Sequence, residues 1–253
     1  MYSPVHLRKG VYILPNLFTT ASMFSAFLSI FWAYAGKFDQ AALAVLISGV
    51  FDGIDGKVAR LTKTTSNFGT QYDSLSDVIA FGVAPSLLMY FWILNTEGHL
   101  GMLVCFLFST CGALRLARFN VQTSSQSTSI PKKFFTGLPI PAAGCTLATL
   151  IFFNQYAAIY YDATTISIGL IFLMALLSLL MVSRIRYAAF KDYGAIKIQP
   201  FSYMVLAILL FVMIASNPTL LGFLFMIGYV ISGPIYTYIF MLRKRSHKKP
   251  PNE

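Results

Sequence analysis

Long runs of apolar residues follow one another along almost the whole chain, and this feature limits what the chain can fold into. A helix crosses the hydrocarbon core of a bilayer with about 20 mostly apolar residues. The runs are apolar throughout, whereas the strands of a transmembrane β-barrel alternate between apolar and polar residues. We therefore expect an all-α fold, a polytopic transmembrane helical bundle of about eight spans, at residues 11–35, 40–60, 74–94, 100–120, 139–160, 165–183, 199–216 and 220–242.

The composition excludes a soluble globular protein. Only 11% of the residues are charged, whereas a soluble domain carries about 25% charged residues to solvate its surface. The net charge of +10 indicates membrane topology and contact with anionic phospholipids. It does not indicate nucleic acid, because no basic DNA-reading helix or RNA-stacking motif accompanies it. Cys105, Cys111 and Cys145 stand apart in apolar runs and predict neither a disulfide framework nor a zinc site.

Basic residues fall almost entirely on one side of the predicted membrane. With eight spans, every Lys and Arg except Lys37 lies on the side that holds both termini. Cytoplasmic loops are enriched in Lys and Arg, so we expect an integral protein of the cytoplasmic (inner) membrane with both termini in the cytoplasm. The expected organisation is a single integral membrane domain, 1–253. It comprises a cytoplasmic or interfacial N-terminus (1–10), a six-span core (11–183), a loop with two additional spans (184–242) and a basic cytoplasmic tail (243–253).

Four of the nine acidic residues lie at the predicted cytoplasmic end of span two and the start of span three. Asp52 and Asp55 are three residues apart and Asp73 and Asp77 are four apart, so each pair shares one helix face. An ionised carboxylate at the bilayer centre costs about 2.5–3.5 kcal/mol, and clustered carboxylates repel one another. Divalent cations would remove both costs, and oxygen ligands without His or Cys favour Mg²⁺, Mn²⁺ or Ca²⁺. Two ions about 4 Å apart would suit in-line phosphoryl displacement.

Two other interpretations of these aspartates stay open. A single aspartate at a helix end can be a cap or a topological anchor, and intramembrane carboxylates also occur in cation transporters. A transporter needs such groups near mid-membrane with access from both sides, whereas these lie near the predicted cytoplasmic surface. Gly53 and Gly56, each costing a helix about 1 kcal/mol, predict close approach of a flat or charged ligand.

The segment from Asp52 to Asp77 reads D-x-x-D-G-x-x-A-R-x8-G-x3-D-x3-D and resembles the signature of the CDP-alcohol phosphotransferases. The resemblance implies a membrane enzyme with a six-helix catalytic core, often dimeric. Such an enzyme cleaves the pyrophosphate of a CDP-linked lipid or alcohol, releases CMP and transfers the phosphoryl-bearing group to a hydroxyl. It further implies two Mg²⁺ or Mn²⁺ ions, with Ca²⁺ as a non-productive occupant, a homodimer, and Asp77 as the general base. The implied metal ligands are Asp52, Asp55, Asp73 and Asp77.

The same resemblance implies contacts with the CDP-linked donor. Segment PNLFT, residues 15–19, is similar to the family motif P-(N/D)-x-x-T, which faces the CDP group. A helix N-cap is the alternative role for Asn16, and the two roles are compatible. The residues expected to bind CDP-diacylglycerol are Asn16, Thr19, Gly53, Gly56, Ala59, Arg60, Ser66 and Gly69.

Three further stretches resemble the membrane-embedded phosphatidylserine synthases of bacteria and archaea: ALRLARFNV (113–121), FTGLPIPAA (135–143) and LMVSRIRYAAFK (180–191). This resemblance implies L-serine as the acceptor, with phosphatidylserine and CMP as products. Ser22 and Ala26 depart from the Asn and Gly that the subgroup leads us to expect in the first span, and we expect them at helix contacts near the site.

A serine acceptor carries a carboxylate that needs a cationic partner. Arg115 and Arg118, three residues apart, could form a bidentate fork, and Lys133, with Lys132, could close over the acceptor from the polar loop 121–133. Contact with lipid phosphate is the alternative for each of these cations. The same charges could bind glycerol-3-phosphate or inositol phosphate, and an ether-lipid donor is a further alternative.

Overall fold

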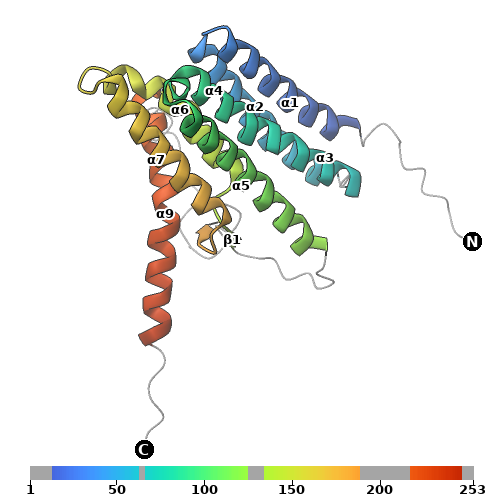
Figure 1. Ribbon diagram of the computed structural model, residues 1–253. Coiled ribbons are helices and arrows are strands. Elements are labelled where there is room, and N and C mark those ends of the chain that lie inside the picture. The colour runs from blue at the N-terminus through green and yellow to red at the C-terminus, as the bar shows by residue number, and fades with distance from the viewer. Residues whose placement is uncertain (1–12, 63–65, 125–133, 189–216, 247–253) are drawn as a thin grey trace, which may run out of the picture.

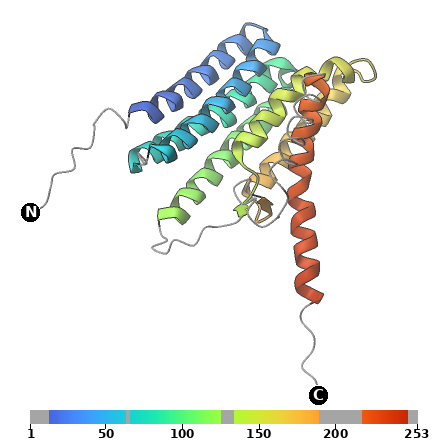
Figure 2. The same cartoon turned by 180° about the vertical axis from the view of Figure 1, so that it is seen from behind.

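The computed structural model describes residues 13–62, 66–124, 134–188 and 217–246. Helices α1, α2, α3 and α5 lie roughly side by side, and α7 and α9 lie on the other side of the bundle (Figures 1 and 2). The helices are α1 (Ile13–Tyr34), α2 (Phe38–Leu61), α3 (Asn67–Asp77), η1 (Val78–Val83), α4 (Ala84–Trp92), η2 (Leu94–Glu97), α5 (His99–Ser124), α6 (Ile140–Ala157), α7 (Ala163–Val182) and α9 (Pro218–Ser246).

Five helical stretches are long and apolar enough to cross a membrane: Pro15–Tyr34, Asn67–Trp92, His99–Gln122, Ala163–Val182 and Thr219–Tyr238. The expected all-α membrane bundle is therefore confirmed. The count of eight spans is not, because the predicted span at 199–216 lies outside the described residues. Two longer described helices are not among these five stretches: α2, which carries three aspartates, and α6.

The third helix begins at Asn67, seven residues before the predicted start at 74. Ser66 is its N-cap, with Oγ accepting the backbone N–H of Gly69 at 2.9 Å. The first turns of α3 are polar, so an apolar count cannot detect them. Asp73 and Asp77 consequently both lie inside α3. The first residues of the predicted cytoplasmic tail (243–253) are helical, because α9 continues through Ser246.

Small residues form the contact between α1 and α2. Ala26 and Ala41 are fully buried. The Ser22 and Ser48 hydroxyl oxygens are 2.7 Å apart, and each hydroxyl also contacts the other residue's backbone carbonyl, at 3.1 and 3.0 Å. In lipid, small side chains and interhelical hydrogen bonds replace the hydrophobic effect as the source of helix association. Ser22 and Ala26, the two residues that differ from the subgroup's Asn and Gly, thus pack α1 against α2. Helix α2 carries two of the four clustered aspartates, Asp52 and Asp55.

A π-helical turn, η1, directly follows Asp77. The N–H of Ala84 donates to the carbonyl of Ile79 five residues back, and Pro85 has no N–H to donate. Two serine hydroxyls donate hydrogen bonds to a carbonyl oxygen of this turn: Ser86 Oγ and Ser109 Oγ lie 2.6 and 3.2 Å from the Gly82 oxygen. Turns of this kind occur mostly as single interruptions of α-helices and are frequent at functional sites.

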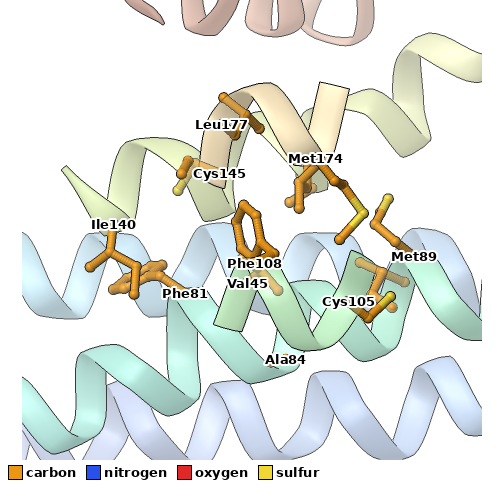
Figure 3. Packing of buried hydrophobic residues seen from close by; sticks show 14 of the residues in the cluster. Val45, Phe81, Ala84, Met89, Cys105, Phe108, Ile140, Cys145, Met174 and Leu177 are labelled. Atoms are coloured by element: carbon orange, nitrogen blue, oxygen red, sulfur yellow. The ribbon is translucent and has the colours of Figure 1, made fainter. Parts of the chain in front are cut away.

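The apolar core lies where η1, α5, α6 and α7 meet. Phe81, Phe108, Ile140 and Met174, one from each of these elements, are fully buried and lie between the packed helices (Figure 3). Interiors of this kind are close-packed, so changes in volume are costly. The core therefore fixes the position of η1, and with it the end of α3.

A short antiparallel sheet joins two of the three stretches that resemble phosphatidylserine synthases. Strand β1 (Phe134–Thr136) pairs with β2 (Arg186–Ala188). The turn after β1 needs glycine, because Gly137 has φ +84° and a Cβ there would lie 2.3 Å from the Met181 carbonyl oxygen. Two segments about 50 residues apart in the sequence therefore form a single unit at the end of α7.

Candidate active site

Aspartates from two helices meet at one end of the bundle. Carboxylate oxygens of Asp52, Asp55 and Asp73 all lie within 4.8 Å of one another, and a side-chain hydrogen bond joins Asp52 to Asp77. Asp55 is only 5% exposed, so it can act only on a partner within the cluster or the adjoining pocket. The spacing along α2 and α3 thus brings the four carboxyl groups together.

The ligand atoms fit a hard divalent cation. One oxygen of Asp73, Oδ1, is buried and has no hydrogen-bond partner among the described residues. A buried acceptor left without a partner costs about 1–3 kcal/mol, and more when it is charged. Two carboxyl groups can hydrogen-bond only when one of them holds a proton, and a cation would take over that proton's role. An all-oxygen set of this kind suits Mg²⁺ or Mn²⁺.

Thr19 of α1 hydrogen-bonds to one of the clustered aspartates. Its hydroxyl donates to Asp55 Oδ2 at 2.8 Å and lies 3.2 Å from the carbonyl oxygen of Pro15. The Thr19 carbonyl in turn accepts a hydrogen bond from Ser76 Oγ of α3 at 3.2 Å. Sequence reasoning expected a donor-lipid contact from Thr19, and the structure adds a bond that orients a metal-binding candidate.

Replacing Thr19 with valine should raise the dissociation constant for Mn²⁺ about 10- to 100-fold, since groups that orient metal ligands typically contribute that much. Free Mn²⁺ is measured by electron paramagnetic resonance during a titration of the purified protein. Thr146→Val is the matched control, because among the described residues the buried Thr146 hydroxyl bonds only to the Ala142 carbonyl of its own helix. Equal weakening in both variants would contradict the orienting role.

An open pocket of about 170 Å³ adjoins the cluster. Asp55 and Asp73 form part of its wall. Of the eight residues predicted to bind the CDP-linked donor, Gly53 alone is absent from the wall: it is exposed, and nothing lies within 4 Å of where its Cβ would be. The other seven line the pocket together: Asn16, Thr19, Gly56, Ala59, Arg60, Ser66 and Gly69.

Three of these residues, Asn16, Gly69 and Arg60, shape the pocket wall in different ways. Asn16 lies within α1, which begins at Ile13, so the N-cap alternative for Asn16 is wrong. A Cβ on Gly69 would lie 3.1 Å from Ser66 Oγ and 3.4 Å from Asn16 Oδ1. The absence of a side chain at Gly69 therefore leaves room both for the Ser66 cap and for the pocket beside Asn16. Arg60, in the last turn of α2, has Nη1 3.7 Å from where a Gly56 Cβ would be, so its guanidinium folds back beside Gly56 in the pocket wall.

Sequence reasoning missed a polar network that fastens α3 to its neighbours. Asn120 Nδ2 of α5 donates to Ser74 Oγ at 3.0 Å and to Gln71 Oε1 at 3.1 Å. On the α1 side, the hydroxyl oxygens of Thr20 and Tyr72 are 2.9 Å apart. Asn120 falls in the stretch ALRLARFNV, so its polar side chain at the end of an apolar run was an available signal.

The predicted acceptor residues have different surroundings. Arg115 is half-buried and interacts electrostatically with Asp77, and its Nε has no hydrogen-bond partner among the described residues. Arg118 is exposed, and its Nη1 donates to the carbonyl of Val182, the last residue of α7, at 3.3 Å. Arg118 therefore caps α7, while the charge of Arg115 interacts with that of Asp77. Lys132 and Lys133 lie outside the described residues.

Comparison with known proteins gives consistent matches. The family model of CDP-alcohol phosphatidyltransferase matches residues 12–175. A Helicobacter pylori protein named CDP-diacylglycerol–serine O-phosphatidyltransferase is 47% identical over 182 residues, 72% of this chain and 74% of its own. A Bacillus subtilis protein of the same name is 34% identical over 72% of this chain and 93% of its own. An archaetidylserine synthase of Methanothermobacter thermautotrophicus is 37% identical over 72% of each chain.

Proposed function

The chain belongs to the CDP-alcohol phosphatidyltransferase family, and from this premise we propose that it is a CDP-diacylglycerol–serine O-phosphatidyltransferase. It transfers the phosphatidyl group of CDP-diacylglycerol to the hydroxyl of L-serine, which gives phosphatidylserine and CMP. The observation that carries the proposal is the buried aspartate cluster opening onto a pocket lined by the family's signature residues. The H. pylori and B. subtilis relatives that bear this name support the choice of serine.

The four aspartates would hold Mg²⁺ or Mn²⁺, and we infer two ions, with Ca²⁺ binding there without turnover. When bound, these ions supply charge neutralisation for the carboxylates and for the pyrophosphate of the donor. Asp77 accepts the proton of the serine hydroxyl. The serine oxygen forms a bond to the phosphorus that carries diacylglycerol, the bond from that phosphorus to the CMP oxygen breaks, and CMP leaves beside Arg60.

The pocket accounts for donor binding. The donor's lipid tails would stay in the bilayer while its pyrophosphate reaches the oxygen cluster. Glycines at 56 and 69 leave space for close approach of the nucleotide, and Arg60 contributes positive charge to the pocket wall. Asn16, Thr19, Ala59 and Ser66 complete the proposed contacts, and Gly53 is proposed as a contact from outside the pocket wall.

Arg115 is the strongest proposed contact for the acceptor carboxylate, because its charge interacts with that of Asp77 and its buried Nε has no hydrogen-bond partner among the described residues. Arg118 and Lys133 remain proposed contacts of the same acceptor. Glycerol-3-phosphate and inositol phosphate are alternative anionic acceptors that these cations would also suit. An ether-lipid donor has one observation in its favour, the similarity to the M. thermautotrophicus archaetidylserine synthase. Family membership removes the basis for the cation-transporter alternative.

We further propose the membrane arrangement expected from the charges: eight spans, both termini cytoplasmic, in the inner membrane among anionic phospholipids. The one-sided distribution of Lys and Arg supports it. The single domain 1–253, with a catalytic core at 11–183, is supported by the family match to 12–175. A homodimer is proposed from the family resemblance.

The proposal is tested by CMP release from CDP-diacylglycerol by the purified protein. Release should depend on L-serine and on Mg²⁺ or Mn²⁺, and it should stop when a chelator removes the metal. Turnover with glycerol-3-phosphate and none with serine would mean that the acceptor is glycerol-3-phosphate, while the chemistry of the family would still hold. A preference for an ether-linked donor over the diacyl donor would favour the archaetidylserine alternative.

A further inference from the structure

A second cavity lies at the opposite end of the bundle from the aspartates. Helix α1 ends and α2 begins at this end, whereas α3 begins at the other (Figure 1). The cavity has a volume of about 690 Å³, which is usual for a ligand site. At about 1.5 Å per residue, the stretch of α2 between Lys37 and Asp52 is about 20 Å long. The cavity is therefore separate from the proposed active site.

Four parts of the chain form the wall of this cavity: the turn at 36–40, the end of α4, the last turns of α6 and the start of α9. Thr219, in the first turn of α9, donates to Asn217 Oδ1 at 2.9 Å and to the Tyr156 hydroxyl oxygen at 3.3 Å. The Tyr156 hydroxyl of α6 also donates to Asn217 Oδ1, at 3.0 Å. These bonds hold the start of α9 against the end of α6, so the cavity is bounded by elements that are fixed to one another.

The wall holds a buried acceptor that lacks a donor. Asn154 Oδ1 is buried and has no hydrogen-bond partner among the described residues, and Asn154 lines the cavity. A buried acceptor of this kind carries a cost that a donor from a ligand would remove. Asn154 therefore indicates a ligand that carries N–H or O–H groups.

The turn at 36–40 offers the complementary groups, which are donors. The N–H of Lys37 is already used, since it donates to the Trp32 carbonyl at 2.8 Å. The N–H groups of residues 38–40 are the first three of α2, which an α-helix leaves without an internal partner, and the N-cap residue Lys37 supplies no side-chain bond to them. Together with the exposed Lys37 ammonium, they suit a phosphate.

The charges and the aromatic residues of the wall narrow the class of ligand. Asp39 balances the charge of Lys37, so the wall suits a zwitterion better than a simple anion. Trp92 lines the cavity and is the last residue of the membrane-spanning stretch Asn67–Trp92. Tryptophan is enriched at the membrane–water interface. A ligand with a phosphate, a protonated amine and an apolar part at this level is a phospholipid.

We propose that this cavity binds the headgroup of a zwitterionic phospholipid with a primary amine, taken from the leaflet opposite the aspartates. The phosphate lies against Lys37 and the start of α2, the ammonium donates to Asn154 Oδ1, and the glycerol part contacts Trp92. No bond is made or broken there, and no step of the proposed reaction takes place there. The protein would thus hold one lipid that it does not transform.

The test measures lipid binding to the purified full chain by native mass spectrometry. The probes are phosphatidylethanolamine, phosphatidylcholine and diacylglycerol with the same acyl chains. Phosphatidylcholine keeps the phosphate and the positive charge but has no N–H, and diacylglycerol has no headgroup. Phosphatidylethanolamine should bind about tenfold more tightly than phosphatidylcholine, and diacylglycerol should bind most weakly. Equal affinities for all three would mean that only the chains bind, and would overturn the proposal.

Two variants and a matched control assign the binding to this cavity. Asn154→Leu should abolish the preference for phosphatidylethanolamine while changing the affinity for phosphatidylcholine less than about threefold. Lys37→Gln should weaken both phospholipids about tenfold. Lys57→Gln makes the same change at an exposed position near the other end of α2, and it should change neither affinity more than about twofold.

Thermal unfolding midpoints show whether each variant is folded. Asn154→Leu should not lower the midpoint, because it replaces an unpartnered polar group with an apolar group of similar size. A folded Asn154→Leu protein that still prefers phosphatidylethanolamine would reject the contact with Asn154. Equal weakening by Lys37→Gln and Lys57→Gln would reject the phosphate site, because it would mean that the lipid responds to basic charge anywhere on the surface.

Discussion

Asp77→Asn should abolish serine-dependent CMP release, with a loss of at least about 10²–10⁴-fold from the missing general base alone. Asparagine keeps the size of the side chain, but it cannot take the proton of the serine hydroxyl and is a weaker metal ligand. Because Asp77 is hydrogen-bonded to Asp52, the change also disturbs the partner carboxylate. The measurement is CMP release at saturating Mn²⁺, with the thermal unfolding midpoint recorded to show that the bundle is intact.

Asp39→Asn is the matched control for this prediction. Asp39 lies in the first turn of α2, the same helix that carries Asp52 and Asp55 near its other end. It is exposed, and the substitution removes the same charge. Activity of Asp39→Asn should stay within about twofold of the unmodified protein. A folded Asp77→Asn protein with more than a tenth of normal turnover would mean that another group takes the proton.

Gly144→Ala should destabilise the bundle by about 1–3 kcal/mol, the usual cost of overpacking a close contact. A Cβ at 144 would lie 2.8 Å from the carbonyl oxygen of Phe81 and 2.9 Å from its Cα. These are backbone atoms of η1, so no flexible side chain can move aside. Thermal unfolding in detergent should show a midpoint lower by several degrees. CMP release should fall as well, because a displaced η1 moves the end of α3 at Asp77.

Gly169→Ala gives the comparison for that experiment. Gly169 lies within α7, and nothing lies within 4 Å of where its Cβ would be. Alanine favours a helix interior by about 1 kcal/mol over glycine, so the midpoint should stay the same or rise slightly. If Gly144→Ala unfolds at the same temperature as Gly169→Ala, the close approach of α6 to η1 has no energetic consequence.

Much of the site can be predicted from the sequence because its parts are local. Asp52 and Asp55, and likewise Asp73 and Asp77, share a helix face through spacing alone, and the glycines that border the pocket lie within the same motif. The apolar runs locate the described spans within a few residues, with the exception of α3. There the helix start depends on the Ser66 cap and on polar turns that carry no apolar signal.

The remaining features depend on contacts between distant segments. The bond from Thr19 to Asp55 joins residues 36 positions apart, and Asn120 reaches α3 from 46 positions away. Strands of three residues, such as β1 and β2, are too short to produce a recognisable alternation. Arg118 has the charge of an acceptor ligand, and only the structure shows that its guanidinium caps α7.

The π-helical turn after Asp77 has a consequence for how this site tolerates change. Each residue advances an α-helix by about 100°, and a turn closed over five residues accommodates one residue more than an α-helical turn. Deleting a single residue between Val78 and Val83 would therefore restore an ordinary α-helical turn and leave the flanking faces of α3 and α4 in phase. It would also remove the widened turn whose Gly82 carbonyl accepts hydrogen bonds from Ser86 and Ser109. A shortened η1 should thus disturb the packing of α4 and α5 before it turns the carboxylates away from α2.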